Sequence, residues 1–262
     1  MVLQKEQIKD FFMSLDEIKE LVKGKEPIFF LDYDGTLTPI VDTPDLAILS
    51  SEMKTVVEKL SHKYKVSIVS GRATDDVHQK VDIKNLFYAG SHGFEIIDPT
   101  NNVTINKEAK EVRNVIKQAY EELSQCLEDV DGALVEDVKY TISAHYRLVA
   151  DNDLSKVKEA VEAITKKYPL LCITYGKKVF EIRPRIDWDK GKAVDFILST
   201  LMFDAQKQVA IYIGDDTTDE DAFRILKGKG FGVLVSEEER ASNAQYKVKT
   251  TNDVQKVLEY FL

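Results

Sequence analysis

Two aspartates follow directly on an apolar run near the start of the chain. The stretch FFLDYDGTLTPI, residues 29–40, continues the buried-strand pattern of residues 28–31, and Asp32 and Asp34 stand at its carboxyl end. Ligands of an open parallel sheet bind in the crevice beyond the strand tips. One interpretation is therefore a pair of catalytic carboxylates, and the alternative is an ordinary strand followed by an Asp-Gly turn.

A second acidic stretch, GDDTTDED at residues 214–221, follows an apolar run of the same kind. Crowded carboxylates repel one another unless a cation neutralises them. Oxygen ligands without cysteine or histidine at suitable spacing favour Mg²⁺. The alternative, a capping box formed by Thr218 and Asp221 on the next helix, does not explain Asp215 and Asp216 at the strand end.

Polar residues and glycines also follow two further buried-strand patterns, and a lysine opens a helix. They are Ser70, Gly71 and Arg72 after VSIV, Gly90, Ser91, His92 and Gly93 after LFYA, and Lys190 in WDKGKA. A lone lysine is more often a surface residue. Together, however, these residues supply what phosphoryl transfer through an aspartyl phosphate needs: a carboxylate nucleophile, a proton donor, a hydroxyl donor and a positive charge.

These strand tips belong to two blocks of chain in which strand and helix patterns alternate, which predicts an α/β fold with a doubly wound parallel sheet. Between the blocks, the order is helix-strand-strand-helix-strand-strand, typical of an α+β domain. We therefore expect a core of residues 1–105 and 185–262, with an N-terminal helical extension at 1–25, and an inserted α+β domain at 106–184.

Composition excludes several classes of function. The formal net charge of -9 argues against non-specific binding to nucleic acid or to an anionic membrane, because both need a basic field. The amino terminus has no signal-peptide pattern and no apolar run approaches the length of a membrane span, so we expect a cytoplasmic protein. Cys126 and Cys172 are too isolated to define a disulfide framework or a zinc site.

The strings DYDGT, SGR, DKG and GDDTTDED, in this order, resemble the motifs of the haloacid dehalogenase (HAD) superfamily of phosphohydrolases. The longer strings LDYDGTLTPI, AGSHG, HYR, EIRPRIDWDKG and IGDDTTDEDAF resemble more closely those of the trehalose-6-phosphate phosphatases. The similarity spans residue 28 to about residue 230. It implies a HAD-like, Rossmann-like core with the inserted domain as its cap, and hydrolysis of trehalose 6-phosphate to trehalose and phosphate in trehalose biosynthesis.

The resemblance also implies roles for individual residues. Asp32 would be the nucleophile and Asp34 the general acid and base, while Ser70 and Lys190 would hold the phosphoryl group.

The same resemblance implies a Mg²⁺ cofactor. It would be bound by the Asp32 carboxylate, the Asp34 backbone carbonyl and Asp215. Asp216 would orient Lys190 or a metal-bound water, and Asp219 would support the loop.

The inserted domain has strand patterns with one polar face. Period-two alternation in YTISAHYRL places Lys139, His145 and Arg147 on the same face, and in KVFEIR it places Glu181 beside Arg183. Such a face over the active site could bind sugar hydroxyls, although an ordinary sheet with one solvated side has the same pattern. The residues expected to contact the substrate are Gly71, Arg72, His92, Lys139, Arg147 and Glu181.

Three alternatives to this function stay open. The substrate could be another sugar phosphate, such as sucrose phosphate or a mannosyl-3-phosphoglycerate, or the enzyme could be a phosphomutase. A non-catalytic regulatory module would be expected to lack Asp32, Asp34 or Lys190, and all three are present. The chain is too short to include a synthase domain as well, so a separate trehalose-6-phosphate synthase is the expected functional partner.

Overall fold

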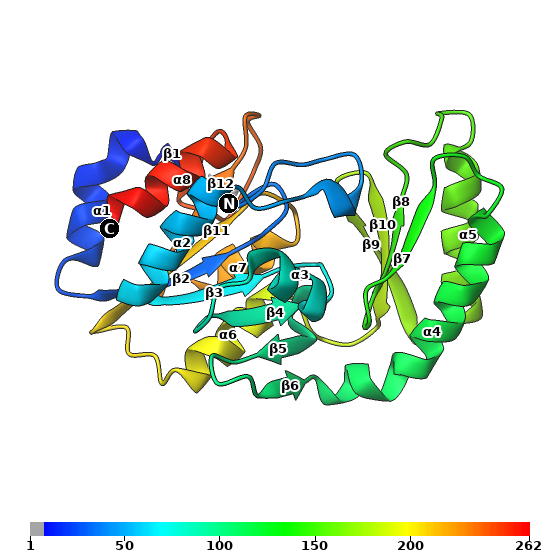
Figure 1. Cartoon of the computed structure of the whole chain (residues 1–262), viewed down its shortest axis with the longest axis horizontal. Coiled ribbons are helices and arrows are strands. Elements are labelled where there is room, and N and C mark those ends of the chain that lie inside the picture. The colour runs from blue at the N-terminus through cyan, green and yellow to red at the C-terminus, as the bar shows by residue number, and fades with distance from the viewer. Residues whose placement is uncertain (1–7) are drawn as a thin grey trace, which may run out of the picture.

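The computed structural model describes residues 8–262, and its larger part is built on a nine-stranded sheet (Figure 1). The strand order is β1-β13-β12-β11-β2-β3-β4-β5-β6, parallel except at the β4–β5 and β5–β6 pairs. The strands are β1 (Lys9–Asp10), β2 (Glu26–Leu31), β3 (Lys65–Val69), β4 (Phe87–Gly90), β5 (Glu95–Ile97), β6 (Val103–Ile105), β11 (Gln208–Gly214), β12 (Gly230–Val235) and β13 (Tyr246–Val248).

Helices cover both faces of this sheet, because its central strands are apolar on both sides. On one face the core includes Phe29 and Leu31 of β2, and on the other it includes Ile28 and Phe30. The first face is covered by α1 (Leu15–Val22), α2 (Ser51–Lys63), α3 (Thr74–Val81) and α8 (Thr251–Tyr260), and the second by α6 (Lys190–Thr200) and α7 (Asp219–Ile225). The doubly wound α/β core is confirmed.

A second, antiparallel sheet in the order β7-β8-β10-β9 forms the cap. Its elements are α4 (Lys107–Leu127), β7 (Leu134–Asp137), β8 (Ile142–His145), α5 (Leu154–Lys167), β9 (Leu171–Gly176) and β10 (Val179–Pro184). The two helices pack against one face through an apolar cluster that includes Leu123, Val161 and Ile182. Figure 1 shows these helices on the side away from the core, so the opposite face of the cap sheet is turned toward the core.

The edges of the large sheet differ from the prediction. Strands β1, β5, β6 and β13 have two to three residues each and no clear alternation, so only pairing with a neighbour identifies them. The N-terminal helix is shorter than the predicted extension. Helix α1 begins only at Leu15, and Phe11 is buried but lies before the helix. Residues 1–7 of the predicted extension lie outside the described residues.

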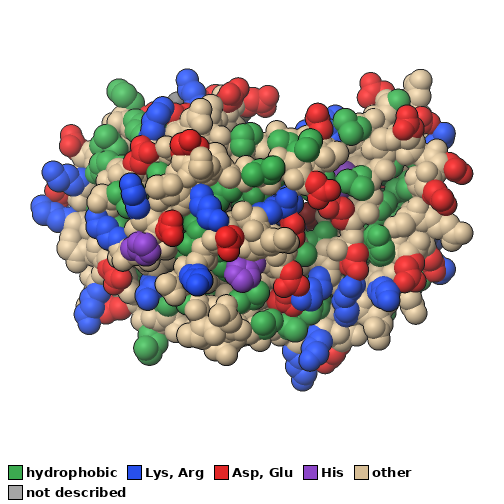
Figure 2. Space-filling view, viewed as in Figure 1, with side chains coloured by type: hydrophobic (Ala, Val, Ile, Leu, Met, Phe, Trp, Pro, Cys, Tyr) green, Lys and Arg blue, Asp and Glu red, His purple; other side chains and the backbone are tan. Residues whose placement is uncertain are grey.

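The cap also docks on the core beside β4 and β5. Ser91 donates its hydroxyl hydrogen to the carbonyl of Val138 at 2.5 Å, and the Lys139 ammonium lies 2.7 Å from the Glu95 carboxylate. Figure 2 shows the molecular surface hollowed where the two parts meet. Within residues 8–262, no helix is long and apolar enough to cross a membrane.

Candidate active site

The carboxyl ends of the two central strands bring three aspartates together. Asp32 follows β2, Asp215 follows the neighbouring strand β11, and Asp219 begins α7. One carboxylate oxygen of each lies within 4.8 Å of the others, and all three side chains are buried. The two separate acidic motifs therefore form one cluster.

Lys190, at the start of α6, is the counter-ion of this cluster. Its ammonium donates to Asp32 Oδ1 and to Asp219 Oδ1, at 2.8 Å in each case. Burial alone would lower the pKa of Lys190, but the charges of Asp219 and Asp32 raise it well above its ordinary value. Burial, together with the nearby charges of Asp219 and Asp215, raises the pKa of Asp32, against the opposing effect of Lys190. Because the charges of these carboxylates raise its pKa, Lys190 stays charged.

Asp219 is fully engaged by protein groups. Besides Lys190, its Oδ1 accepts from the Tyr212 hydroxyl at 2.6 Å, and its Oδ2 accepts from the backbone N–H groups of Asp215 and Asp216, both at 2.9 Å. Burial opposes its ionisation, yet the Lys190 charge and these hydrogen bonds lower its pKa. Asp219 therefore supports the loop after β11 and has no free oxygen for a metal ion.

Asp32 and Asp215 remain available to a cation. Asp215 Oδ1 is buried and has no hydrogen-bond partner among the described residues. A Cβ on Gly35 would lie 2.2 Å from Asp215 Oδ2, so only glycine leaves room for this carboxylate. Burial, with the Asp219 charge, raises the pKa of Asp215 to about 6. An unpaired buried oxygen beside a second carboxylate fits a hard divalent cation.

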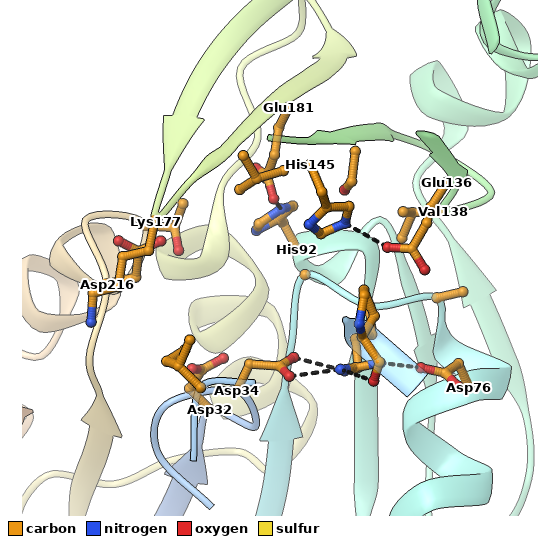
Figure 3. Close-up of a pocket in the computed structure, with 18 of the residues that line it drawn as sticks. Asp32, Asp34, Asp76, His92, Glu136, Val138, His145, Lys177, Glu181 and Asp216 are labelled. Atoms are coloured by element: carbon orange, nitrogen blue, oxygen red, sulfur yellow. Dashed lines mark hydrogen bonds and ion pairs between the residues drawn. The ribbon is translucent and has the colours of Figure 1, made fainter. Parts of the chain in front are cut away.

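Arg72 lines the pocket, but its guanidinium is engaged by Asp34. Its Nε and Nη2 atoms donate to the two Asp34 oxygens at 2.7 Å each, and its Nη1 donates to Asp76 at 2.9 Å (Figure 3). Burial opposes the charge, but the bonds to Asp34 raise the pKa of Arg72. Ser70 is buried beside them and accepts the Arg72 backbone N–H at 3.1 Å.

A pocket of about 370 Å³ opens above these residues, between the core and the cap. Asp32, Asp34 and Lys190 line it from the core, and Glu181 of β10 lines it from the cap. Glu181 Oε1 lies 3.0 Å from His92 Nε2 (Figure 3). Burial opposes its ionisation, but the charge and hydrogen bond of His92 lower the pKa of Glu181 to about 2.

Of three further predicted substrate contacts, two line this pocket and one does not. Gly71 lines it, and a Cβ there would lie 3.1 Å from the His92 ring. Arg147 lines it too, although its Nη2 donates to the Lys177 carbonyl at 2.9 Å. Lys139 does not line the pocket. It precedes β8, has a left-handed backbone conformation with φ of 68°, and its ammonium binds Glu95. The period-two alternation does not extend to Lys139.

In this structure, Asp216 does not contact Lys190, and Thr218 does not cap a helix with its side chain. The Asp216 carboxylate accepts from the Thr217 backbone N–H at 2.7 Å, whereas Asp219 orients Lys190. Thr218 precedes α7 but makes no side-chain capping hydrogen bond, so the capping-box alternative is not seen.

Two ion pairs of the pocket were not predicted from the sequence, although one of the residues involved, His145, was. Lys177, in the turn between β9 and β10, donates its ammonium hydrogen to Asp215 Oδ2. Glu136 of β7 and His145 of β8 lie 2.6 Å apart on the pocket wall. The HYR string and the polar alternation pointed to His145, but no local pattern indicates a contact between Lys177 and a residue 38 positions away.

Comparison with known proteins shows which family and which fold this chain resembles. The chain is 44% identical over 258 residues to the probable trehalose-phosphate phosphatase D of Arabidopsis thaliana, covering 93% of this chain and 69% of that protein. The C-terminal domain of C. albicans trehalose-6-phosphate phosphatase has the same fold, with a TM-score of 0.81, 20% identity and 98% coverage of both chains. A haloacid dehalogenase-like hydrolase from Bacteroides thetaiotaomicron also shares it, with a TM-score of 0.65, 16% identity and coverage of 91% of this chain and 100% of that one.

The family model for trehalose-phosphatase matches residues 30–252, which include the acidic cluster, Lys190 and the whole cap. The predicted trehalose-phosphatase family, the HAD-like fold and the enzyme class are therefore confirmed, and the chain belongs to the trehalose-phosphatase family.

Proposed function

We propose that the chain hydrolyses trehalose 6-phosphate to trehalose and phosphate through an aspartyl phosphate on Asp32. The observation that carries this proposal is the buried Lys190 bridge between Asp32 and Asp219 at the floor of the pocket. It holds a carboxylate oxygen and a positive charge side by side where a phosphoryl group would enter. Family membership and the curated relatives support the choice of substrate.

The chain's own residues can perform both chemical steps. An Asp32 oxygen attacks phosphorus while the bond from phosphorus to the sugar oxygen breaks, and Asp34 gives a proton to that leaving oxygen. Asp34 then accepts a proton from a water that attacks phosphorus, the bond from phosphorus to the Asp32 oxygen breaks, and inorganic phosphate and the Asp32 carboxylate are released. Arg72 holds Asp34 at the pocket wall, so Asp34 must turn from Arg72 toward the sugar oxygen.

A Mg²⁺ ion would be held by the carboxylates of Asp32 and Asp215, with the Asp34 backbone carbonyl as the third protein ligand. Bound there, it would neutralise the phosphoryl oxygens and the crowded carboxylates. Lys190, which donates to Asp32 Oδ1, is the proposed donor to one phosphoryl oxygen, and the Ser70 hydroxyl is the proposed donor to another. Asp219 keeps Lys190 in place.

Glu181 is the proposed sugar contact, with Arg147 and His92 beside it. Because its pKa is about 2, Glu181 is a carboxylate at neutral pH and accepts hydrogen bonds from sugar hydroxyls. Lys139 is better explained as a contact between cap and core, through Glu95.

Phosphate release from a panel of esters tests both halves of the proposal. We expect activity on trehalose 6-phosphate to exceed that on sucrose 6-phosphate, glucose 6-phosphate and p-nitrophenyl phosphate, and EDTA to abolish it. Excess Mg²⁺ should restore it. Equal rates across the panel would contradict the sugar assignment, and full activity in EDTA would contradict the metal assignment. Phosphate that appears on a second sugar position instead of in solution would identify a phosphomutase.

Replacing Glu181 with glutamine should separate sugar recognition from the chemistry. Losing a charged acceptor costs about 1.5–3 kcal/mol, so we expect kcat/KM for trehalose 6-phosphate to fall about 10- to 150-fold. The value for p-nitrophenyl phosphate, which lacks the sugar, should stay within about twofold. Steady-state kinetics on both substrates measure this difference.

Glu122→Gln is the matched control, because Glu122 also lies in the cap but pairs with Lys167 outside the pocket. It should leave both substrates unaffected. An equal loss on both substrates in Glu181→Gln would mean that Glu181 acts on the reaction centre or on cap closure.

The remaining expectations concern the cell. A separate trehalose-6-phosphate synthase is the proposed source of the substrate, and the cytoplasm is the proposed location. A regulatory module without turnover is the second candidate function, and an inactive wild-type protein in the ester panel would favour it.

A further inference from the structure

The turn of the β9–β10 hairpin brings a lysine of the cap to an aspartate of the core. Lys177 donates to Asp215 Oδ2, and the Asp215 side chain is buried. The lysine side chain itself is 47% exposed. The ammonium can therefore leave the carboxylate for solvent without crossing the protein interior.

Neighbouring groups of the same turn also meet the core loop. Thr217 donates its hydroxyl hydrogen to the Tyr175 carbonyl at 3.3 Å. A Cβ on Gly176 would lie 3.3 Å from an Asp216 oxygen. The Lys177 ion pair is thus part of a closed contact between the hairpin turn, residues 175–178, and the core loop, residues 215–217.

The cap holds the backbone of Lys177 in place. Arg147 donates to the Lys177 carbonyl at 2.9 Å, and the Tyr146 backbone N–H donates to the Lys178 carbonyl at 3.1 Å. Lys178 has a left-handed conformation, with φ of 66°, that turns the chain there. Lys177 is consequently presented to Asp215 by fixed groups of the cap.

Asp215 is also one of the two carboxylates that fit the metal. Lys177 occupies its Oδ2, while Oδ1 has no partner among the described residues. A divalent cation on either oxygen would place two positive centres on one carboxylate. Because this carboxylate is buried, solvent screens their repulsion poorly. Binding of the metal and docking of Lys177 must therefore oppose each other.

We propose that Lys177 is an internal competitor of the divalent cation at Asp215, so that metal binding releases the hairpin turn from the core loop. This inference rests on the proposed metal site. Thermodynamic linkage makes the effect reciprocal. If docking of Lys177 weakens metal binding by a given free energy, metal binding weakens docking of the hairpin by the same free energy. Lys177 thereby sets the metal affinity of the resting enzyme and couples it to the position of the cap.

Titration calorimetry of Mg²⁺ into the full chain, without substrate, tests this competition. Lys177→Met should lower the Kd at least about fivefold, the lower end of typical coupling between two sites. Lys178→Met removes the same charge one residue away, from an ammonium that lies over the Tyr146 ring, and should change the Kd less than about twofold. Asp215→Asn should abolish binding.

Hydrogen exchange provides a readout independent of affinity. Mg²⁺ should speed exchange of the amides at 175–178 in the wild type, and the Lys177→Met variant should show fast exchange already without the metal. An unchanged or weaker affinity in Lys177→Met, or equal tightening in both lysine variants, would overturn the competition. If instead Asp215→Asn binds Mg²⁺ like the wild type, the proposed metal site itself is wrong.

Discussion

Replacing Asp32 with asparagine should lower kcat for trehalose 6-phosphate by about 10³-fold or more, the range expected when a covalent nucleophile is removed. The fold should remain intact. Burial and two nearby carboxylates raise the pKa of Asp32, so a neutral side chain relieves crowding, and Lys190 keeps its bond to Asp219. Phosphate release and thermal unfolding, measured on the same sample, check the two parts of the expectation.

Chemical trapping provides the control for the mechanism. Borohydride reduces an acyl phosphate, so quenching during turnover should convert Asp32 to homoserine in the wild type. With p-nitrophenyl phosphate, whose leaving group needs no proton from Asp34, Asp34→Asn should slow only hydrolysis of the intermediate and so increase the yield. Asp32→Asn should give none. Activity within tenfold of the wild type in Asp32→Asn, with an intact mass that excludes deamidation, would remove the aspartyl phosphate from the mechanism.

Replacing Lys190 with methionine should damage both catalysis and stability. The variant leaves Asp32 and Asp219 buried without their counter-ion. Breaking a buried ion pair by removing one partner typically costs about 3–5 kcal/mol, so we expect the free energy of unfolding to fall by about that amount. Turnover should fall by about 10² to 10³-fold, because the donor to the phosphoryl group is lost. Chemical denaturation and phosphate release measure these effects.

Lys192→Met is the matched control for Lys190→Met. Lys192 lies two residues further along the same helix, and its side chain pairs with Asp187 at the surface. A surface substitution of this kind changes stability by less than about 0.5 kcal/mol.

Mg²⁺ should raise the unfolding temperature of Lys190→Met more than that of the wild type, since it neutralises the same carboxylates. Wild-type stability in Lys190→Met would show that the buried ion pair contributes little.

The parts predicted from sequence are those whose signals are local and repeated. Buried apolar runs identified β2, β3, β4 and β11, and because parallel strands end at one edge, Asp32 and Asp215 were expected to meet. The order of helices and strands in the cap could be predicted as well, because each of them has its own apolar periodicity. The edge strands β1 and β13 were not, since two or three residues carry no period.

Side-chain partners were harder to predict than side-chain positions. Arg72 follows a strand tip as expected, but its binding to Asp34 depends on the relative placement of two strands. The period-two alternation of the following strand predicts Lys139 on its polar face, but Lys139 itself has a left-handed backbone conformation that interrupts this alternation. Lys177 sits in a turn, where a lysine normally faces water, and only the docking of the cap gives it a partner.

The cap elements form one uninterrupted stretch, from Lys107 to Pro184, and the proposed catalytic and metal-binding side chains all lie outside it. The segment that faces the sugar could therefore be exchanged, in evolution or in the laboratory, as a single cassette while the hydrolytic machinery stays untouched. The exception would be the hairpin turn at Lys177, which such a transplant would have to match to the new host's loop.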